Sequence, residues 1–215
     1  MTSFLTQADQ DAISAAIAEQ ERRTLAELVT VVTDASDNYR YIPVLWAAII
    51  SMIIPGLVFI LGGWQDFSSL YSMQVLLFVA LAVGFRVSPI KYMLIPKAIK
   101  HQRAARMARQ QFFAQRLHHT EQRLGVLLFV SVAEHYVEIL ADTGASEKIS
   151  DQQWAEIVDD FSSKVAAEQV VQGFLQAIGR CGDLLAEVAP QDASPVDALP
   201  NNLVILKADD SRSLL

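Results

Sequence analysis

Three acidic residues are the chain's candidates for metal-dependent chemistry. Asp34 and Asp37 follow an apolar run at residues 25–33, and Glu134 follows a second run at residues 125–132. If both runs are parallel strands, their carboxyl ends meet at one edge of a sheet, where ligands of open α/β folds bind. Carboxylate oxygens there could bind a hard cation such as Ca²⁺ or Mg²⁺. The alternative is that the Asp residues form a turn and Glu134 is solvated.

The other residues that could do chemistry do not form a recognised set. Cys181 is the only cysteine, so neither an intrachain disulfide nor a cysteine-based zinc site is expected. His118 and His119 would point about 100° apart on a helix and could not chelate one ion as an i, i+4 pair would. Glu138 lies in an apolar run, where a carboxylate is either a desolvated functional group or a partner of Arg or solvent. Phosphate-loop, HExxH and GxSxG motifs do not occur.

A nearly uncharged stretch interrupts the chain. Between Arg40 and Arg86 only Asp66 carries a charge. The segments on its two sides match the roughly 20 residues that a helix needs to cross a ~30 Å hydrocarbon core. We therefore expect a two-helix membrane hairpin over residues 43–61 and 70–85, and the alternative is a buried hairpin of a soluble protein. Aromatic residues that suit the membrane interface stand near the expected ends: Tyr41, Trp46, Trp64 and Tyr71.

The charge distribution predicts the orientation of this hairpin. The net charge is −7, yet residues 86–123 contain nine Lys or Arg and one acid, and residues 62–69 contain no Lys or Arg. The positive-inside rule then predicts a two-pass membrane protein with its termini and soluble domain in the cytoplasm. Because the rest of the chain is acidic, the basic block does not indicate nucleic-acid binding.

Residues 97–122 contain no Pro or Gly and predict one long helix after the hairpin. Basic residues recur at every third position in its first half, and we expect them to contact anionic lipid head groups, each contributing about 1 kcal/mol. These residues are Lys97, Lys100, Arg103, Arg106 and Arg109. The second half, residues 112–122, is expected to pack on the core. The alternative is a solvated basic face on a helix that packs on a sheet.

The remaining pattern predicts an α/β fold. Thr6 and Ser150 are expected N-caps, residues 25–33 and 125–132 parallel strands, 136–141 an antiparallel third strand and 203–206 a short edge strand. Gly179 and Gly182 are expected to allow close packing of a helix over residues 170–188. The predicted organisation is a first helix and strand (1–40), the transmembrane hairpin (41–87), a basic juxtamembrane helix (88–124), the rest of the domain (125–189) and a mostly flexible tail (190–215).

This order of elements, with GVLLFVSVAEHYVEILAD at its centre, resembles the TPM domain family. It is similar above all to a bacterial subgroup of uncharacterised membrane proteins with a two-helix membrane insertion, and this resemblance implies a place in the bacterial inner (cytoplasmic) membrane. The resemblance implies a small α/β/α sandwich, and it implies Ca²⁺ or Mg²⁺ binding and phosphatase activity, to which the broader family has been linked. The family's glycine-rich loop after the third strand is reduced here to Asp142-Thr143-Gly144-Ala145, which weighs against transferring either role.

We therefore expect a membrane-anchored TPM-like domain that acts as an interaction or scaffold module at the cytoplasmic membrane face, without a cofactor. Its expected partners are the lipid bilayer and a membrane-associated protein. The alternative is a metal-dependent phosphatase-like hydrolase, for which no convergent catalytic set is visible. Two short spans without a buried charge give a transporter no pathway.

Overall fold

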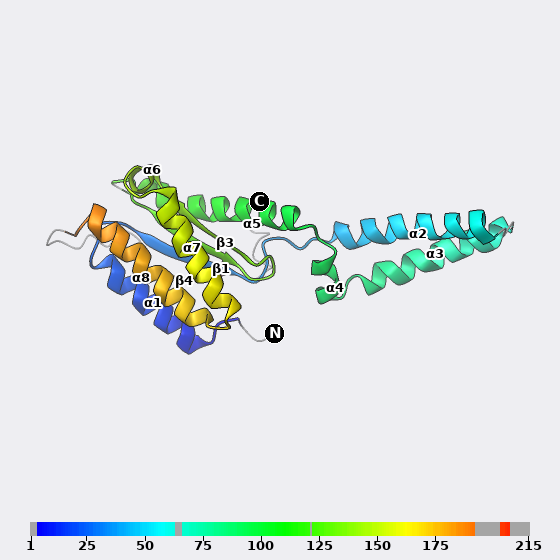
Figure 1. Cartoon of the computed structure of the whole chain (residues 1–215), viewed down its shortest axis with the longest axis horizontal. Coiled ribbons are helices and arrows are strands. Elements are labelled where there is room, and N and C mark those ends of the chain that lie inside the picture. Colours follow the sequence, from blue (N-terminus) through cyan, green and yellow to red (C-terminus); the bar gives the residue numbers. More distant parts are fainter. Residues whose placement is uncertain (1–3, 63–65, 121, 192–202, 207–215) are drawn as a thin grey trace. The chain divides into compact units, whose positions relative to one another are not determined.

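The computed structural model describes residues 4–62, 66–120, 122–191 and 203–206 of the 215-residue chain (Figure 1). The chain divides into two compact units, one formed by Met1–Ser36 with Gln102–Leu215 and the other by Asp37–His101. Most of the predicted flexible tail, residues 190–215, lies outside the described residues.

The first unit is built on a four-stranded sheet in the order β3-β2-β1-β4. Strands β1 (Leu28–Thr33) and β2 (Val126–Ser131) are parallel, and β3 (Tyr136–Ala141) is antiparallel to β2. Strand β4 (Leu203–Leu206) pairs in parallel with the other side of β1. The predicted strand directions and the predicted edge strand are confirmed. Every residue of β1 and β2 is buried, which explains why their sequences are mostly apolar and do not alternate with charged residues.

Helices cover both faces of this sheet. Helices α1 (Gln7–Glu21), α7 (Asp151–Ala166) and α8 (Val170–Val188) pack with Leu28 and Val32 of β1 in one apolar core. Helix α5 (Lys97–Ala114) packs from Ala104 onward with Val29 and Val31 in a second core on the opposite face. Neighbouring residues of β1 thus alternate between the cores. The arrangement is an α/β/α sandwich, as the sequence predicts.

Local signals in the sequence account for several element boundaries. Thr6 and Ser150 each form a capping box, at the starts of α1 and α7. A side chain at Gly182 would lie 2.3 Å from Oε1 of Gln20 on α1, so this glycine does permit close packing. The same expectation for Gly179 is wrong, because a Cβ there would meet no atom within 4 Å.

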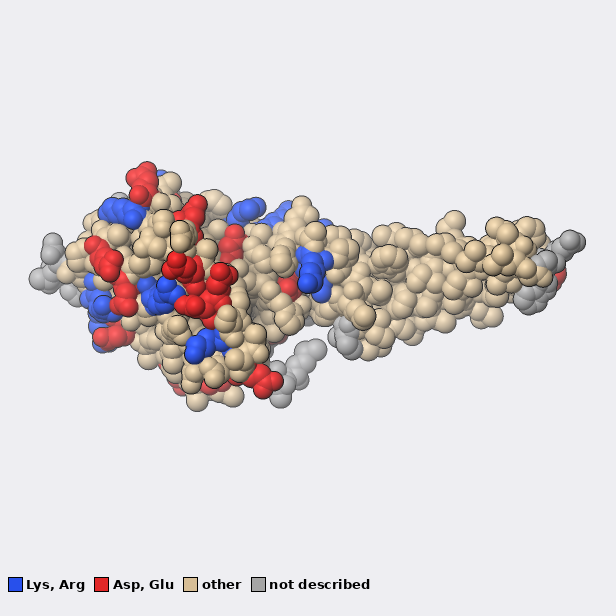
Figure 2. Space-filling view, in the orientation of Figure 1, with Lys and Arg blue, Asp and Glu red and all other residues tan. Residues whose placement is uncertain are grey.

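The second unit contains the predicted hairpin, formed by α2 (Tyr41–Gly62) and α3 (Phe67–Gly84). At 1.5 Å per residue these helices are about 33 and 27 Å long, and both are long and apolar enough to span a membrane. In Figure 2 the surface over α2 and α3 is almost uniformly free of charged residues. Asp66 accepts hydrogen bonds from the amides of Ser68 and Ser69 and thereby caps α3. Of the predicted interface aromatics, Trp64 lies outside the described residues.

An aromatic cluster closes the open end of this hairpin. Tyr39 and Ile95 are buried together there, and the rings of Tyr39 and Tyr92 meet edge to face at 6.1 Å. The ammonium of Lys91, on the short helix α4 (Ser88–Met93), lies 4.6 Å from the Tyr92 ring centroid. The indole N–H of Trp46 donates to the carbonyl of Leu94 at 3.1 Å. Amphipathic rings and a cation at one end of two apolar helices are typical of a membrane interface.

The predicted long helix over residues 97–122 is wrong in its second half. Helix α5 ends at Ala114, Arg116 takes a left-handed conformation (φ 57°), and a short 3₁₀ turn, Leu117–His119, follows. Leu117 is fully buried, so the chain turns inward there instead of continuing along the surface. Phe112 packs on the core as expected, whereas Phe113 is 60% exposed.

Candidate functional site

The carboxyl edge of the parallel strands is organised around Glu134, in the turn between β2 and β3. This side chain is only 3% exposed. Its carboxylate oxygens each accept from the backbone amide of Ser36 at 3.1 Å, and Oε2 also accepts from the hydroxyl of Ser131. The hydroxyl of Ser36 in turn donates to that of Ser131 at 2.8 Å. Glu134 therefore fastens the loop after β1 to the end of β2.

The structure uses the two predicted Asp ligands in different ways. Asp34 is exposed, and its backbone carbonyl accepts from the amide of Ala133 at 3.0 Å. The carboxylate of Asp37 accepts from the amide of Tyr39 at 3.2 Å, as in an Asx turn, and belongs to the second unit. Among the described residues, no group of three or more His, Cys, Asp or Glu side chains is placed to hold a metal ion. Metal binding by Asp34, Asp37 and Glu134 stays a prediction.

An apolar cavity of about 330 Å³ lies beside this network, between the β2–β3 turn and α7. Its polar lining comes from Ser131, Ser162 and His135, the last in a left-handed conformation (φ 50°). The Ser131 hydroxyl donates to Glu134 and the Ser162 hydroxyl to the carbonyl of Val158. Both hydroxyls thus serve the fold, and neither is set up as an activated nucleophile. The remaining lining is Phe4, Val130, Val132, Tyr136, Val137, Phe161, Val165 and Ala166.

Glu138 pairs with a tyrosine on its own strand. The hydroxyl of Tyr136 donates to Oε2 of Glu138 at 2.9 Å. Burial raises the pKa of Tyr136 above its usual value, the negative charge of Glu138 raises it further, and the positive charge of Arg109 opposes both effects. Tyr136 is therefore a neutral hydrogen-bond donor that satisfies Glu138, which gives this carboxylate a structural explanation.

Asp142 and Cys181, the two remaining candidates for chemistry, also have structural roles. Asp142 accepts from the amide of Thr143 at 2.8 Å, which starts the one-turn helix α6 (Thr143–Ser146), and pairs with Nε of Arg123 at 3.1 Å. Cys181 is fully buried, and burial raises the pKa of its thiol to about 12. The reactive thiolate is therefore a negligible species at neutral pH.

The predicted lipid-contacting residues do not share one face of α5. A spacing of three residues corresponds to about 300° of rotation, so each basic side chain lies about 60° behind the previous one. From Lys97 to Arg109 the row sweeps about 240° around the helix. Arg106 and Arg109 are exposed, and Arg109 lies near enough to Tyr136 of β3 for its charge to act on that side chain, whereas Lys97 and Lys100 precede the part of α5 that packs on the sheet. Lipid contact by Lys97, Lys100, Arg103, Arg106 and Arg109 stays a prediction.

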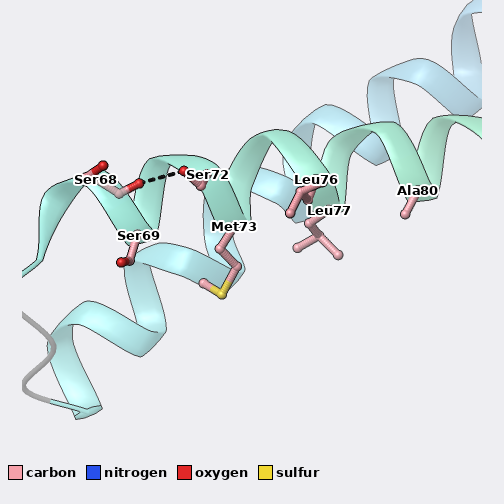
Figure 3. A pocket seen from close by; sticks show the side chains of 7 residues that line it. All are labelled: Ser68, Ser69, Ser72, Met73, Leu76, Leu77 and Ala80. Carbon is pink, nitrogen blue, oxygen red and sulfur yellow. Dashed lines mark hydrogen bonds between the residues drawn. The ribbon is translucent and has the colours of Figure 1, made fainter.

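Helix α3 has a hollow along one side that only its own residues line (Figure 3). The hydroxyl of Ser72 donates to the backbone carbonyl of Ser68 at 2.9 Å, as the dashed line in Figure 3 shows. The Ser72 hydroxyl at the polar end of the hollow is therefore engaged by its own helix. The side chains that line the remainder of the hollow are apolar. The lining residues are Ser68, Ser69, Ser72, Met73, Leu76, Leu77 and Ala80.

The Glu134 network makes a testable prediction about stability. In Glu134→Gln only one side-chain oxygen remains to accept, and the new amide N–H₂ meets donors at Ser36 or Ser131. Leaving buried groups unsatisfied should lower the free energy of unfolding by about 1–3 kcal/mol, measured by denaturant unfolding in detergent micelles. The matched control is Glu156→Gln, whose carboxylate forms an exposed pair with Arg180 and should change stability by under about 0.5 kcal/mol. Equal stability of the two variants would contradict the anchoring role.

The same samples test the predicted metal site. A cation that binds only the folded protein raises its stability in proportion to the logarithm of its concentration. Stabilisation of the wild type by Ca²⁺ or Mg²⁺ that is lost in Asp34→Asn and in Glu134→Gln would confirm the site. A wild type that does not respond to either cation would contradict it.

Comparisons with known proteins agree with this architecture. Residues 90–184, from within α4 to within α8, match the family model of the TPM domain. The chain is similar to the NMR structure of the BA42 protein from the psychrophilic bacterium Bizionia argentinensis sp. nov., with a TM-score of 0.59 and 18% identity over 95% of this chain and 97% of that one. At that identity the likeness shows the fold alone. No curated protein matches the chain.

Proposed function

Because this chain carries a TPM domain, joined to two helices that could each span a membrane, we propose that it is a membrane-anchored interaction module. It holds a protein partner at the cytoplasmic face of the bacterial inner (cytoplasmic) membrane. The two apolar helices support this proposal, because the bacterial subgroup that the sequence resembles has a two-helix membrane insertion.

The observation that carries this proposal is the exposure of apolar side chains around the hairpin. None of the residues of α3 is buried, and in α2 Met52, Ile60 and Leu61 are 69–81% exposed. Water would make such a surface costly, since each square ångström of apolar area left in water forgoes about 25 cal/mol. A bilayer removes this cost, and the two helices satisfy their backbone groups internally, as spanning segments must.

The arrangement of charged and aromatic residues supports the cytoplasmic placement. Nine basic residues follow α3 over residues 86–123, and residues 62–69 between the helices contain no Lys or Arg. The cluster of Tyr39, Tyr92, Lys91 and Trp46 stands at the end of the hairpin that leads to the TPM domain. Basic residues on that side favour its retention in the cytoplasm.

We favour an interaction module over the alternative, a metal-dependent phosphatase-like hydrolase. Hydrolysis requires a nucleophile or activated water with a base in reach. At the carboxyl edge, Glu134 accepts hydrogen bonds from Ser36 and Ser131, and the hydroxyl of Ser162, which also lines the cavity, donates to its own helix. The Glu134 network holds the loop after β1 in place, which suits a surface that presents a fixed shape to a partner.

Cysteine labelling in spheroplasts tests the anchoring and its orientation. An impermeant maleimide should label Ser68→Cys, next to the connector, without permeabilisation, and should label Ser163→Cys on α7 only after the membrane is opened. The native Cys181 serves as an internal control, because it is fully buried and should not react in either case. Labelling in the reverse order would refute the orientation. Release of the protein from membranes by alkaline carbonate would refute the anchoring.

A further inference from the structure

One exposed stripe of α5 lies outside the face of the helix that packs against the sheet. It consists of Arg106, Arg109 and Phe113 and is called the Arg–Phe stripe below. Taking about 100° per residue, these residues lie about 140–200° around the helix from Ala104, at the centre of the buried face. They span about 10 Å along α5. The opposite face, packed against the sheet, consists of Ala104, Met107, Ala108, Gln111 and Phe112.

Phe113 is an exposed aromatic side chain that packs against neighbouring rings. It is 60% exposed, although its neighbour Phe112 is buried. The Phe113 ring makes edge contacts with Phe112 at 5.9 Å and with His118 at 5.1 Å, and His118 in turn lies 4.1 Å from His119. The ring is thus held in place on two sides while its remaining surface faces outward. Aromatic side chains that are fixed before binding lose little entropy on binding and are enriched among hot spots of protein interfaces.

The two arginines of the stripe carry positive charge outside any ion pair of the described residues, although the charge of Arg109 also acts on Tyr136 of β3. Both are exposed, and no carboxylate of the described residues lies within ion-pair distance of Arg106 or Arg109. A guanidinium binds a carboxylate through two parallel hydrogen bonds, which gives geometric specificity that an ammonium lacks. The stripe therefore presents two carboxylate-binding groups about one helical turn apart and an apolar anchor one turn further.

We propose that the Arg–Phe stripe binds an acidic protein segment, with two carboxylates on Arg106 and Arg109 and an apolar side chain against Phe113. This inference rests on the proposed function, since it names the chemistry of the partner that the module holds. The observations favour a protein over a lipid surface. A helix that binds lipid along its length inserts an apolar face, and the apolar face of α5 is already buried in the second core.

A peptide selection on the full-length protein tests this assignment. The protein is placed in nanodiscs of neutral phosphatidylcholine, and a displayed library of random 12-residue peptides is selected on it. The enriched peptides should combine at least two Asp or Glu with an aromatic or aliphatic residue. Their dissociation constants should rise about tenfold or more in Phe113→Ala and in Arg106→Gln/Arg109→Gln.

Matched variants separate the stripe from general effects. Leu175→Ala removes a 37% exposed apolar side chain on α8, and Arg22→Gln removes an exposed guanidinium on α1, so both should bind the peptides as the wild type does. Phe113→Tyr keeps the ring and should retain binding. Since Phe113 and both arginines are exposed, their replacement should leave the unfolding temperature unchanged, and this is measured on the same samples.

Several outcomes would overturn the proposal. These are a failure to enrich peptides, enriched peptides without acidic residues, and equal binding by the wild type and the stripe variants. Peptide binding that disappears in nanodiscs of phosphatidylglycerol would assign the stripe to lipid instead. None of these results alters the labelling of Ser68→Cys and Ser163→Cys, so the stripe and the membrane anchoring can fail separately.

Discussion

Val31→Asp is expected to unfold the α/β/α domain, although it alters one side chain of one strand. Val31 is fully buried in β1, which lies between β2 and β4, and it faces the core that α5 covers. Its partner across the sheet is Phe129 of β2, and Ala108 of α5 belongs to the same apolar cluster, so a carboxylate at this position would be desolvated. An unpaired buried charge costs about 3–5 kcal/mol, which approaches the roughly 5–15 kcal/mol of a whole domain.

Limited proteolysis of the membrane-bound protein measures this effect. In the wild type, the segment from β2 to α8 should resist cleavage, and in Val31→Asp it should be digested. Leu25→Asp is the matched control, because Leu25 precedes β1 and is 39% exposed, so the same new charge stays in water. A resistant segment in Val31→Asp would mean that β1 is not part of the core.

Gly125→Ala is expected to be the second severe change. A Cβ at Gly125 would lie 2.2 Å from the carbonyl oxygen and 2.8 Å from the carbonyl carbon of Leu117. Both are backbone atoms, and the fully buried Leu117 side chain fixes their position, so the clash cannot be relieved by a rotamer change. We expect a loss of about 3 kcal/mol, at the upper end of the usual cost of overpacking.

The chain supplies a control of opposite sign for this prediction. Gly179 lies within α8, and a Cβ there would meet no atom within 4 Å. Gly179→Ala should therefore stabilise the protein by about 0.5–1 kcal/mol, because alanine loses less backbone entropy in a helix. The unfolding temperatures should move in opposite directions. A decrease in the unfolding temperature of both variants would show that the space available for a Cβ does not determine the effect of these substitutions.

The sheet could be predicted from sequence because its signals are local. The runs that contain β1 and β2 are almost continuously apolar and show no alternation, which is typical of strands covered on both faces. The end of α5 could not be predicted in the same way. The left-handed residue there is Arg116 rather than glycine, and the turn is imposed by burial of Leu117 beneath Gly125, a contact between separate elements.

The candidate sites likewise combine features that local sequence signals predict with features that depend on contacts between distant segments. The apolar runs predict that Asp34 and Glu134 lie at one edge of the sheet, but they do not indicate Ser36 as the main partner of Glu134, because 98 residues separate the two in the chain. The three-residue spacing of the basic residues of α5 does not by itself show which of them share a face. The helical phase set by the small residues Ala104 and Ala108 could have distinguished the buried Phe112 from the exposed Phe113.

The position of β1 in the sheet has a consequence for biosynthesis. Its partners are β2, which begins at Val126, and β4, which begins at Leu203, while β1 itself ends at Thr33. During translation β1 therefore leaves the ribosome with both hydrogen-bonding edges open, and α2 and α3 are synthesised before either edge can close. Domain folding follows synthesis of the hairpin, and the open strand is exposed to aggregation in the interval. Slow elongation after residue 84 would lengthen that interval and increase the need for a chaperone.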